Sequence, residues 1–165
     1  MLAGIGRLTA SLSSTDVAQA RRAAEELAGL GADSQEAAIA LIGACRSDDS
    51  QVRQWAVAAL EQLGPPRIED VGGLISLVDA QEELAGYWAV TLLGRLRAEA
   101  ASAAQSLGRT LKCSPYPSVC QRAAWALREL GPSAGPAKAS LEQAAASPEP
   151  RLARLAREAL EQLAG

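Results

Sequence analysis

Histidine and phenylalanine are absent from this chain of 165 residues, and aromatic residues make up only 3% of it. Without histidine, the chain lacks the commonest general base and one of the commonest metal ligands. The apolar residues are mostly alanine and leucine, whereas a β-sheet core favours β-branched and aromatic residues. The composition therefore excludes histidine-based chemistry and favours closely packed helices.

Cysteine is scarce as well. The chain has three cysteines, Cys45, Cys113 and Cys120, and an odd number argues against a disulfide framework. The N-terminal segment lacks the basic start of a secretory signal. We therefore expect a reducing compartment and a cytoplasmic location. Cys45 shares a repeat column with Val78 and Leu111 and is interpreted as a small core residue.

Excess positive charge, long apolar runs and catalytic motifs are also missing. The net charge of −3 gives no overall attraction to phosphate backbones or anionic membranes, so nucleic acid is disfavoured as a partner. No apolar run approaches the roughly 20 residues needed to cross a membrane. Neither a Cys-x-x-Cys pair, a phosphate-binding glycine loop nor a nucleophile elbow is found. We expect no catalytic residue, no metal and no cofactor.

What the sequence does contain is a repeat based on the segment Ser50–Gly64. Its last leucine recurs at intervals of 33, 33, 34 and 33 residues, at Leu30, Leu63, Leu96, Leu130 and Leu163. Two more columns recur three and seven residues earlier, at Leu27, Leu60, Leu93, Leu127 and Leu160, and at Ala23, Ala56, Ala89, Ala123 and Ala156. This period is typical of a solenoid, and these offsets place the columns on one helix face.

The period predicts pairs of helices. The segment with the repeated leucines forms the second helix of each pair, over about 16–29, 50–63, 83–96, 117–130 and 150–163. The first helices are expected over about 34–46, 67–78, 100–112 and 134–146. A short helix over 2–12 resembles half a repeat and is expected to cap the stack. We expect one domain over 1–165, with repeats at about 1–31, 32–64, 65–97, 98–131 and 132–165.

The start of the second helix carries a further pattern. An acidic loop precedes a Val-Arg pair, alanine-rich turns and Leu-x-x-Leu-Gly, in Asp48, Asp49, Ser50, Gln51, Val52, Arg53, Ala56, Leu60, Leu63 and Gly64. The segment Val119–Gly131 matches it too, with Cys120 in the place of the arginine. The pattern resembles that of HEAT repeats. The resemblance implies an all-α fold, a right-handed α-α superhelix of about four HEAT-like helix pairs plus a half-repeat N-terminal cap.

The two ends of the predicted stack differ. In the last repeat, Arg157 and Glu142 replace residues that are apolar in inner copies, as expected where one face has no neighbour. The N-terminal helix instead keeps Leu2, Ile5 and Leu8. Either that end is loosely covered or it meets another molecule, which includes a second copy of the chain.

Candidate binding residues lie in the columns of the second helix that the core does not need. The resemblance implies that this helix lines the concave surface. These columns hold all three tryptophans, together with a tyrosine and two arginines: Arg22, Trp55, Tyr87, Trp88, Arg122 and Trp125. Neighbouring helices pack about 8–10 Å apart, so we expect Trp55 beside Trp88 and Trp125 one turn further along. These residue types dominate interface energetics.

The favoured interpretation is a non-enzymatic binding or scaffold module that captures a protein or peptide on this strip. The alternative is a structural repeat domain that assembles through its N-terminal end, with the tryptophans packed between repeats. Two enzyme groups with similar repeats, the HEAT-like alkylpurine DNA glycosylases and the bilin lyases, are minor alternatives. The strip lacks the aspartate of the first group, and no lyase motif is present.

Overall fold

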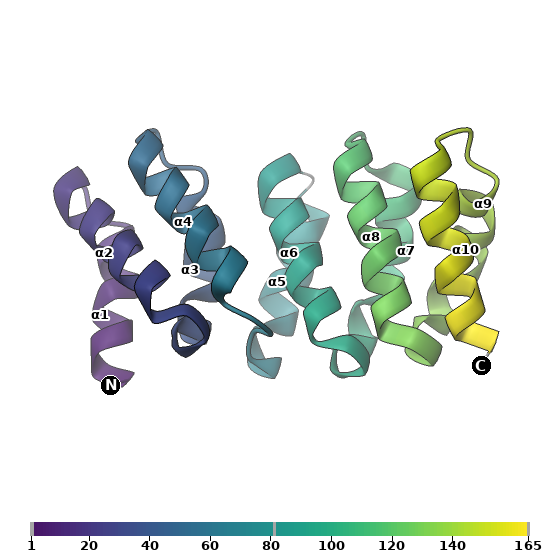
Figure 1. The fold of residues 1–165 in the computed structure, drawn as a ribbon, viewed down its shortest axis with the longest axis horizontal. Helices are drawn as coiled ribbons and strands as arrows, with labels where there is room; N and C mark the ends of the chain where they lie inside the picture. The colour runs from purple at the N-terminus through teal and green to yellow at the C-terminus, as the bar shows by residue number, and fades with distance from the viewer. Residues whose placement is uncertain (1, 81, 165) are drawn as a thin grey trace. The chain divides into compact units, whose positions relative to one another are not determined.

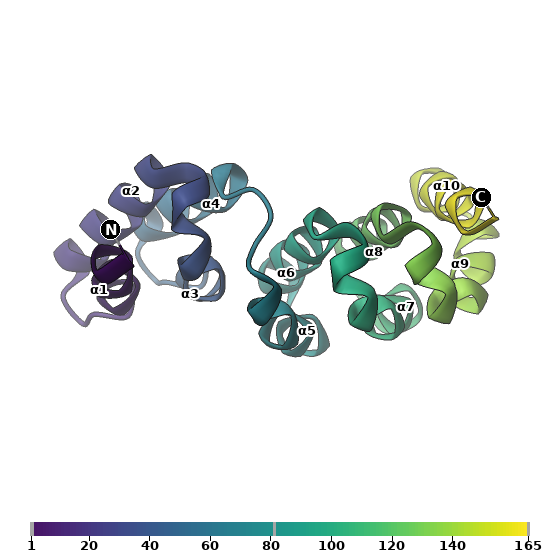
Figure 2. The same ribbon diagram turned by 90° about the horizontal axis from the view of Figure 1, so that it is seen from below.

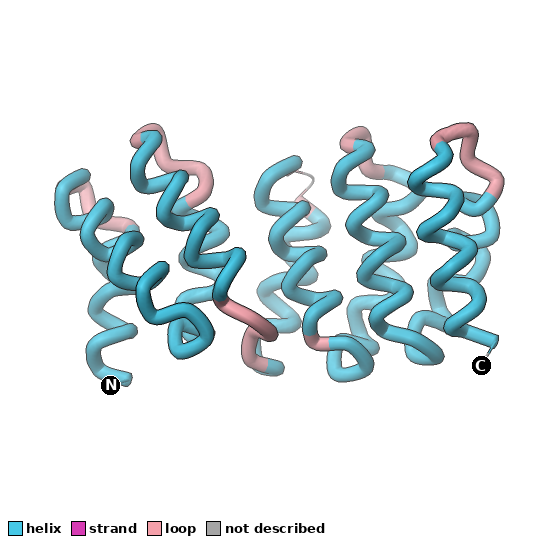
Figure 3. The backbone as a smooth tube through the Cα atoms, viewed as in Figure 1, coloured by secondary structure: helices cyan, strands magenta, loops and turns pink. Residues whose placement is uncertain are grey.

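The structure is a computed structural model that describes residues 2–80 and 82–164, except for the side chains of Leu2 and Ala3. Over these residues the regular structure is helical, with loops between the helices and no strand (Figure 3). The all-α prediction is therefore confirmed. The chain divides into two compact units, Met1–Asp70 and Val71–Gly165. The single domain expected over 1–165 stays a prediction.

The first unit contains two helix pairs (Figure 1). Helix α1 (Leu2–Leu12) packs on α2 (Val17–Leu30), and α3 (Ala38–Ala44) packs on α4 (Ser50–Gln62). The second helices α2 and α4 also contact each other, as do α1 and α3. The unit is therefore a two-layer stack, in which the 3₁₀ segment η1 (Gly31–Ala37) leads into α3.

The second unit contains three helix pairs arranged in the same way. Each first helix packs on the second helix of its own pair, and neighbours within each layer pack on one another (Figure 2). The first helices are α5 (Val71–Asp79), α7 (Ala104–Cys113) and α9 (Lys138–Ala145). The second helices are α6 (Glu83–Arg95), α8 (Pro117–Leu130) and α10 (Pro150–Ala164).

The second helices begin and end within one residue of their predicted bounds, but the first helices do not. Their N-terminal halves are 3₁₀ segments: η1, η2 (Ile68–Asp70), η3 (Arg97–Ala103) and η4 (Gly131–Ala137). Ser34 and Ala100 leave helical geometry, with φ/ψ of −90°/16° and −92°/25°. The Ser34 hydroxyl donates to the Gly31 carbonyl at 2.7 Å. This side-chain bond competes with the α-helical backbone pattern.

The repeated columns form the core, as expected. The five column alanines are at most 1% exposed: Ala23, Ala56, Ala89, Ala123 and Ala156. The column leucines are buried in the inner repeats but half-buried at Leu30 in the first repeat and at Leu160 and Leu163 in the last. Arg157 and Glu142 are exposed there. Of the predicted apolar N-terminal residues, Ile5 is buried, Leu8 is half-buried, and the side chain of Leu2 lies outside the described residues.

A residue with positive φ follows each of four second helices. Gly31, Gly64 and Gly131 have φ of 53°, 74° and 58°. The equivalent residue after α6 is Arg97, with φ of 54°, the one non-glycine residue with positive φ in the described part of the chain. Glycine adopts this conformation without a Cβ clash, so the backbone at Arg97 is strained.

Replacing Arg97 with glycine should therefore stabilise the protein. The Arg97 side chain is exposed, and relief of the left-handed strain is worth about 1 kcal/mol. Urea unfolding followed by circular dichroism should show a higher midpoint for Arg97→Gly. The matched change Gly131→Ala, at the same position of the next repeat, should lower it. An unchanged or lower midpoint for Arg97→Gly would contradict this account.

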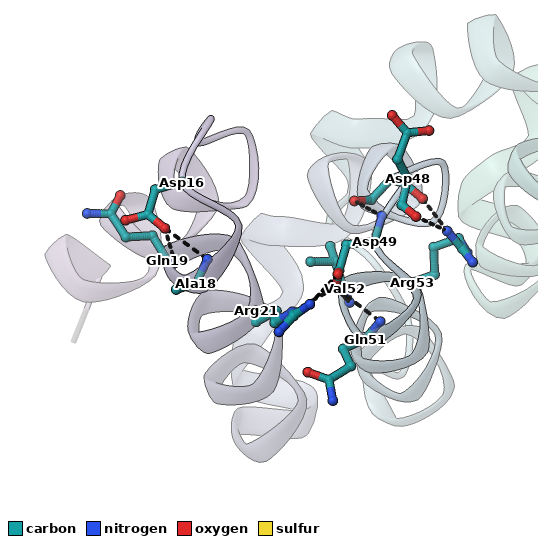
Figure 4. A network of polar contacts seen from close by, with 10 residues as sticks. Asp16, Ala18, Gln19, Arg21, Asp48, Asp49, Gln51, Val52 and Arg53 are labelled. Carbon is teal, nitrogen blue, oxygen red and sulfur yellow. Dashed lines mark hydrogen bonds and ion pairs between the residues drawn. The ribbon is translucent and has the colours of Figure 1, made fainter.

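An acidic residue joins α2 to α4 in the first unit (Figure 4). Asp49 caps α4, since its Oδ1 accepts from the backbone N–H groups of Gln51 and Val52 at 3.1 and 3.0 Å. The same oxygen accepts from Nε of Arg21 on α2 at 2.9 Å. The hydrogen bond from Arg21, reinforced by the Val52 N–H, holds the pKa of Asp49 well below its usual range. Arg53 does not take part in this contact, since its side chain donates to backbone carbonyls of the loop that precedes α4.

The Asp49 contact makes the stability of the first unit depend on pH. A carboxyl whose pKa is lowered by folding stabilises the fold above its unfolded pKa of about 3.9 and loses this effect as the pH falls further. Asn caps helices as well as Asp does, so Asp49→Asn removes the charge and keeps the cap. The variant should be less stable than the parent at pH 7, and the difference should shrink below about pH 3.

The control is Asp16→Asn. Asp16 caps α2 through the N–H of Ala18 at 2.9 Å and meets no arginine among the described contacts (Figure 4). Thermal unfolding of both variants between pH 2 and 7 should therefore show a much smaller pH-dependent difference for Asp16→Asn. Equal behaviour of the two variants would argue against a special role of the Arg21 pair.

Candidate functional site

Three of the predicted site residues come together on the second helices of the second unit. Tyr87 lies on α6, and Arg122 and Trp125 lie one turn apart on α8. The Arg122 Cζ is 4.6 Å from the centre of the Tyr87 ring and 5.1 Å from the centre of the Trp125 ring. Arg122 Nη2 also donates a hydrogen bond to the Tyr87 hydroxyl. Both aromatic rings therefore hold the guanidinium by cation–π contact.

A glycine on the neighbouring helix gives Trp125 its place. A Cβ at Gly94 of α6 would lie 2.4 Å from Trp125 Cζ3 and 3.1 Å from the Cα of Ala126. No side chain fits there, so the indole rests directly on the backbone of α6. This contact fixes the ring against which Arg122 stacks.

Trp88 lies beneath the same cluster. It is 6% exposed, and its ring meets the Tyr87 ring edge-on, with centroids 5.6 Å apart and an interplanar angle of 90°. This geometry is favourable for aromatic pairs. Trp88 therefore supports Tyr87 from the core side, and Tyr87 is the member of the pair that is half-exposed.

Helix α10 completes a hollow beside Arg122. This hollow, the arginine pocket, has a volume of about 220 Å³ and is lined by Tyr87, Ser118, Gln121, Arg122, Trp125, Arg151, Arg154 and Leu155. The lining thus includes three arginines and no acidic residue among the described side chains. Arg151 was missed by the sequence analysis. It shares a column with Gln51, Leu84 and Ser118, and comparing this column between repeats would have found it.

The carboxylates close to the arginine pocket already have partners. Glu83 accepts from the Ser118 hydroxyl at 2.8 Å. Glu149 accepts from Gln121 Nε2 at 3.1 Å and caps α10 through the N–H of Arg151 at 3.0 Å. These contacts leave no described carboxylate paired with Arg122 or Arg151.

A third carboxylate, Glu158, contacts Arg154 but does not line the pocket. It accepts from Arg128 Nη1 at 2.7 Å and from Arg154 Nη1 at 2.6 Å. The Arg128 guanidinium, assisted by that of Arg154, holds the pKa of Glu158 below its ordinary value. Arg154 thus has a carboxylate partner, whereas Arg122 and Arg151 form no ion pair among the described contacts.

A second hollow adjoins the first across Tyr87. This apolar pocket, of about 350 Å³, is lined by Glu83, Leu84, Tyr87 and Ser118. The Leu84 side chain is 41% exposed. Tyr87 is therefore a wall shared by a positively charged hollow and an apolar one.

The remaining two predicted site residues belong to the first unit. Trp55 on α4 is 38% exposed, and Arg22 on the adjacent helix α2 is also exposed. Both side chains are accessible on that unit. The predicted position of Trp55 beside Trp88 concerns residues of different units and stays a prediction.

Other chemistry is limited in the described residues. Burial raises the pKa of the Cys45 thiol to about 12 and also raises that of Cys120, while Cys113 is exposed. No cluster of three or more potential metal-binding His, Cys, Asp or Glu residues is found in the described part of the chain. None of the described helices combines the length and the apolar character that a membrane crossing requires.

The three tryptophans should differ in fluorescence. Variants that retain one tryptophan, with phenylalanine at the other two positions, should be quenched by iodide in the order Trp55, Trp125, Trp88, because accessibility falls in that order. Trp88 should also emit at the shortest wavelength. Equal quenching of Trp88 and Trp55 would contradict the burial of Trp88.

No protein-family model matches the sequence, and no curated protein matches it. Solved structures do match the fold. An engineered protein is 22% identical, with a TM-score of 0.66 over 98% of this chain and 79% of that chain. A designed armadillo repeat protein in complex with the peptide (KR)4 is 17% identical, with a TM-score of 0.67 over 98% of this chain and 82% of that chain.

A natural protein is similar as well. A chain from the complex of CpcE and CpcF of phycocyanin lyase from Nostoc sp. PCC7120 is 23% identical, with a TM-score of 0.63. The match covers 96% of this chain but only 64% of that chain. At these identities the likeness concerns the fold alone. The protein has the fold of armadillo- and HEAT-type helical repeats, as its sequence predicted.

Proposed function

We propose that this protein is a non-enzymatic binding module that captures a protein or peptide on the face of its second helices that the core does not use, the face expected to be concave. The observation that carries the proposal is the Arg122 guanidinium, which stacks on Tyr87 and Trp125. It lies beside a hollow lined by the second helices α6, α8 and α10. The proposed contact residues of the second unit are Tyr87, Arg122 and Trp125, with Trp88 as a buried support. Those of the first unit are Arg22 and Trp55.

The chemistry of these side chains favours binding over packing. Tyrosine, tryptophan and arginine carry most of the energy in protein interfaces. Arg122 is half-buried, and among the described contacts it makes no ion pair. A guanidinium has five N–H donors, and the hydrogen bond to Tyr87 uses one of them. The others remain for a partner.

The similar structures support a peptide partner and weigh little on catalysis. One designed armadillo repeat protein was solved with the peptide (KR)4. That peptide is basic, whereas the pocket here is lined by arginines, so a partner of this chain would differ in charge. A lyase complex has the same fold, but the chain has no histidine and its candidate site contains cations and aromatic rings.

Assembly through the N-terminal end is the second candidate. A hollow of about 320 Å³ lies between α1 and α2, lined by Gly4, Ile5, Leu8, Glu26 and Leu30. The half-buried side chains of Leu8 and Leu30 give it an apolar surface. A partner at this hollow would be independent of Arg122, which separates the two candidates experimentally.

The free cysteines fit the proposed cytoplasmic location.

Selection from a displayed library of random peptides tests the main proposal. Peptides enriched on the immobilised protein should bind it in solution. The substitution Arg122→Ala should lower their affinity by about 30-fold, the effect of a hot spot worth about 2 kcal/mol. Tyr87→Phe should lower the affinity less, since it removes the hydroxyl and keeps the ring.

The matched control is Arg109→Ala. Arg109 is exposed on α7 and pairs with Asp79 at 3.0 Å, away from the second-helix face. This change should leave peptide affinity unaltered, and circular dichroism should show all variants folded. Lack of enrichment, or binding that survives Arg122→Ala, would refute the proposed surface.

A further inference from the structure

We infer that the arginine pocket binds the carboxylate of an aspartate or glutamate in an acidic, extended segment of the partner. The inference rests on the proposed function and specifies the partner's chemistry at one position. The pocket brings together Arg122 from α8 and Arg151 and Arg154 from α10. A side chain that enters it meets three guanidinium groups within one hollow.

Two of the three arginines of the pocket have no carboxylate partner among the described contacts. Glu83 and Glu149 accept hydrogen bonds from other groups, namely Ser118, Gln121 and the N-terminal end of α10. Of the pocket arginines, Glu158 pairs with Arg154. Arg122 and Arg151 form no ion pair among the described contacts, so their N–H donors are available to an anion. An anion would supply the missing partner.

The pocket is also ordered in advance. The rings of Tyr87 and Trp125 hold the Arg122 guanidinium at 4.6 and 5.1 Å from their centres. Stacking occupies the faces of the guanidinium and leaves donors at its edge, which match a carboxylate in a two-bond arrangement. Less side-chain entropy is lost on binding when the arginine is already fixed.

The size and surroundings favour a single acidic side chain over a larger anion. The volume of about 220 Å³ is below the range of about 300–1,000 Å³ that is usual for small-molecule sites. Glu83, Glu149 and Glu158 each contact a residue of the pocket lining, and the chain has a net charge of −3. A nucleic-acid backbone that extends beyond the pocket would meet these carboxylates, whereas the lining that a single side chain enters contains no acidic residue.

Fluorescence anisotropy with four labelled probes tests this inference. The probes are the octapeptides (Gly-Glu)4, (Gly-Gln)4 and (Gly-Lys)4 and the oligonucleotide octathymidylate. The glutamate peptide should bind at least about tenfold more tightly than the glutamine peptide, which is the effect of about one charged hydrogen bond. The lysine peptide and octathymidylate should bind more weakly than the glutamate peptide.

Variants assign this binding to the pocket. Arg151→Gln changes an exposed residue and should lower the affinity for the glutamate peptide about tenfold. Arg122→Gln should have at least the same effect. The control Lys112→Gln removes one positive charge from an exposed position on α7 outside the pocket. It should change affinity less than about twofold, which separates a specific site from general attraction.

The outcomes distinguish the two proposals. Equal binding of the glutamate and glutamine peptides, or tighter binding of the lysine peptide, overturns the acidic partner and leaves a peptide-binding face in place. Tighter binding of octathymidylate overturns it in favour of nucleic acid. If no probe binds while library-selected peptides do, the acidic inference alone fails. If neither probes nor library peptides bind, the proposed function fails with it.

Discussion

Close packing between successive second helices requires small buried side chains, and the fold depends on them. One column supplies an alanine in every repeat, and all five alanines are at most 1% exposed. A methyl group allows helices to approach toward the short end of the usual 8–10 Å range. At Gly94 even a methyl group would be too large, because the Trp125 ring occupies its place. The close approach of α6 and α8 at Gly94 thus positions the Trp125 ring of the candidate site.

The sequence predicted the second helices well because their signal is local and periodic. Three columns at helical offsets specify both the helix and its buried face. The bounds of the first helices were less accurate, because these helices begin with 3₁₀ segments. The backbone leaves helical geometry both at Ser34, which bonds the Gly31 carbonyl, and at Ala100, which has no side-chain donor, so no residue type marks the break in the sequence.

The candidate site was predictable in composition but not in orientation. Tyr87 and Trp88 are adjacent in sequence and therefore point about 100° apart on a helix. Which of them faces outward depends on tertiary packing, and the structure places Trp88 in the core and leaves Tyr87 half-exposed. The stacking of Arg122 was equally hidden, because it requires the side chain of a helix 35 residues away. Columns with aromatic residues identified the region, and tertiary contacts determined the roles.

The arginine pocket takes its residues from α6, α8 and α10, so its dimensions depend on the spacing of these three second helices. Stretching or bending the second unit would move Tyr87 away from Arg122, and Arg122 away from Arg151. An occupant that contacts all three helices would oppose such motion, by the same free energy with which the motion weakens binding. A segment bound in the pocket would thereby couple occupancy to elasticity: it would stiffen the unit, and tension on the unit would weaken its binding.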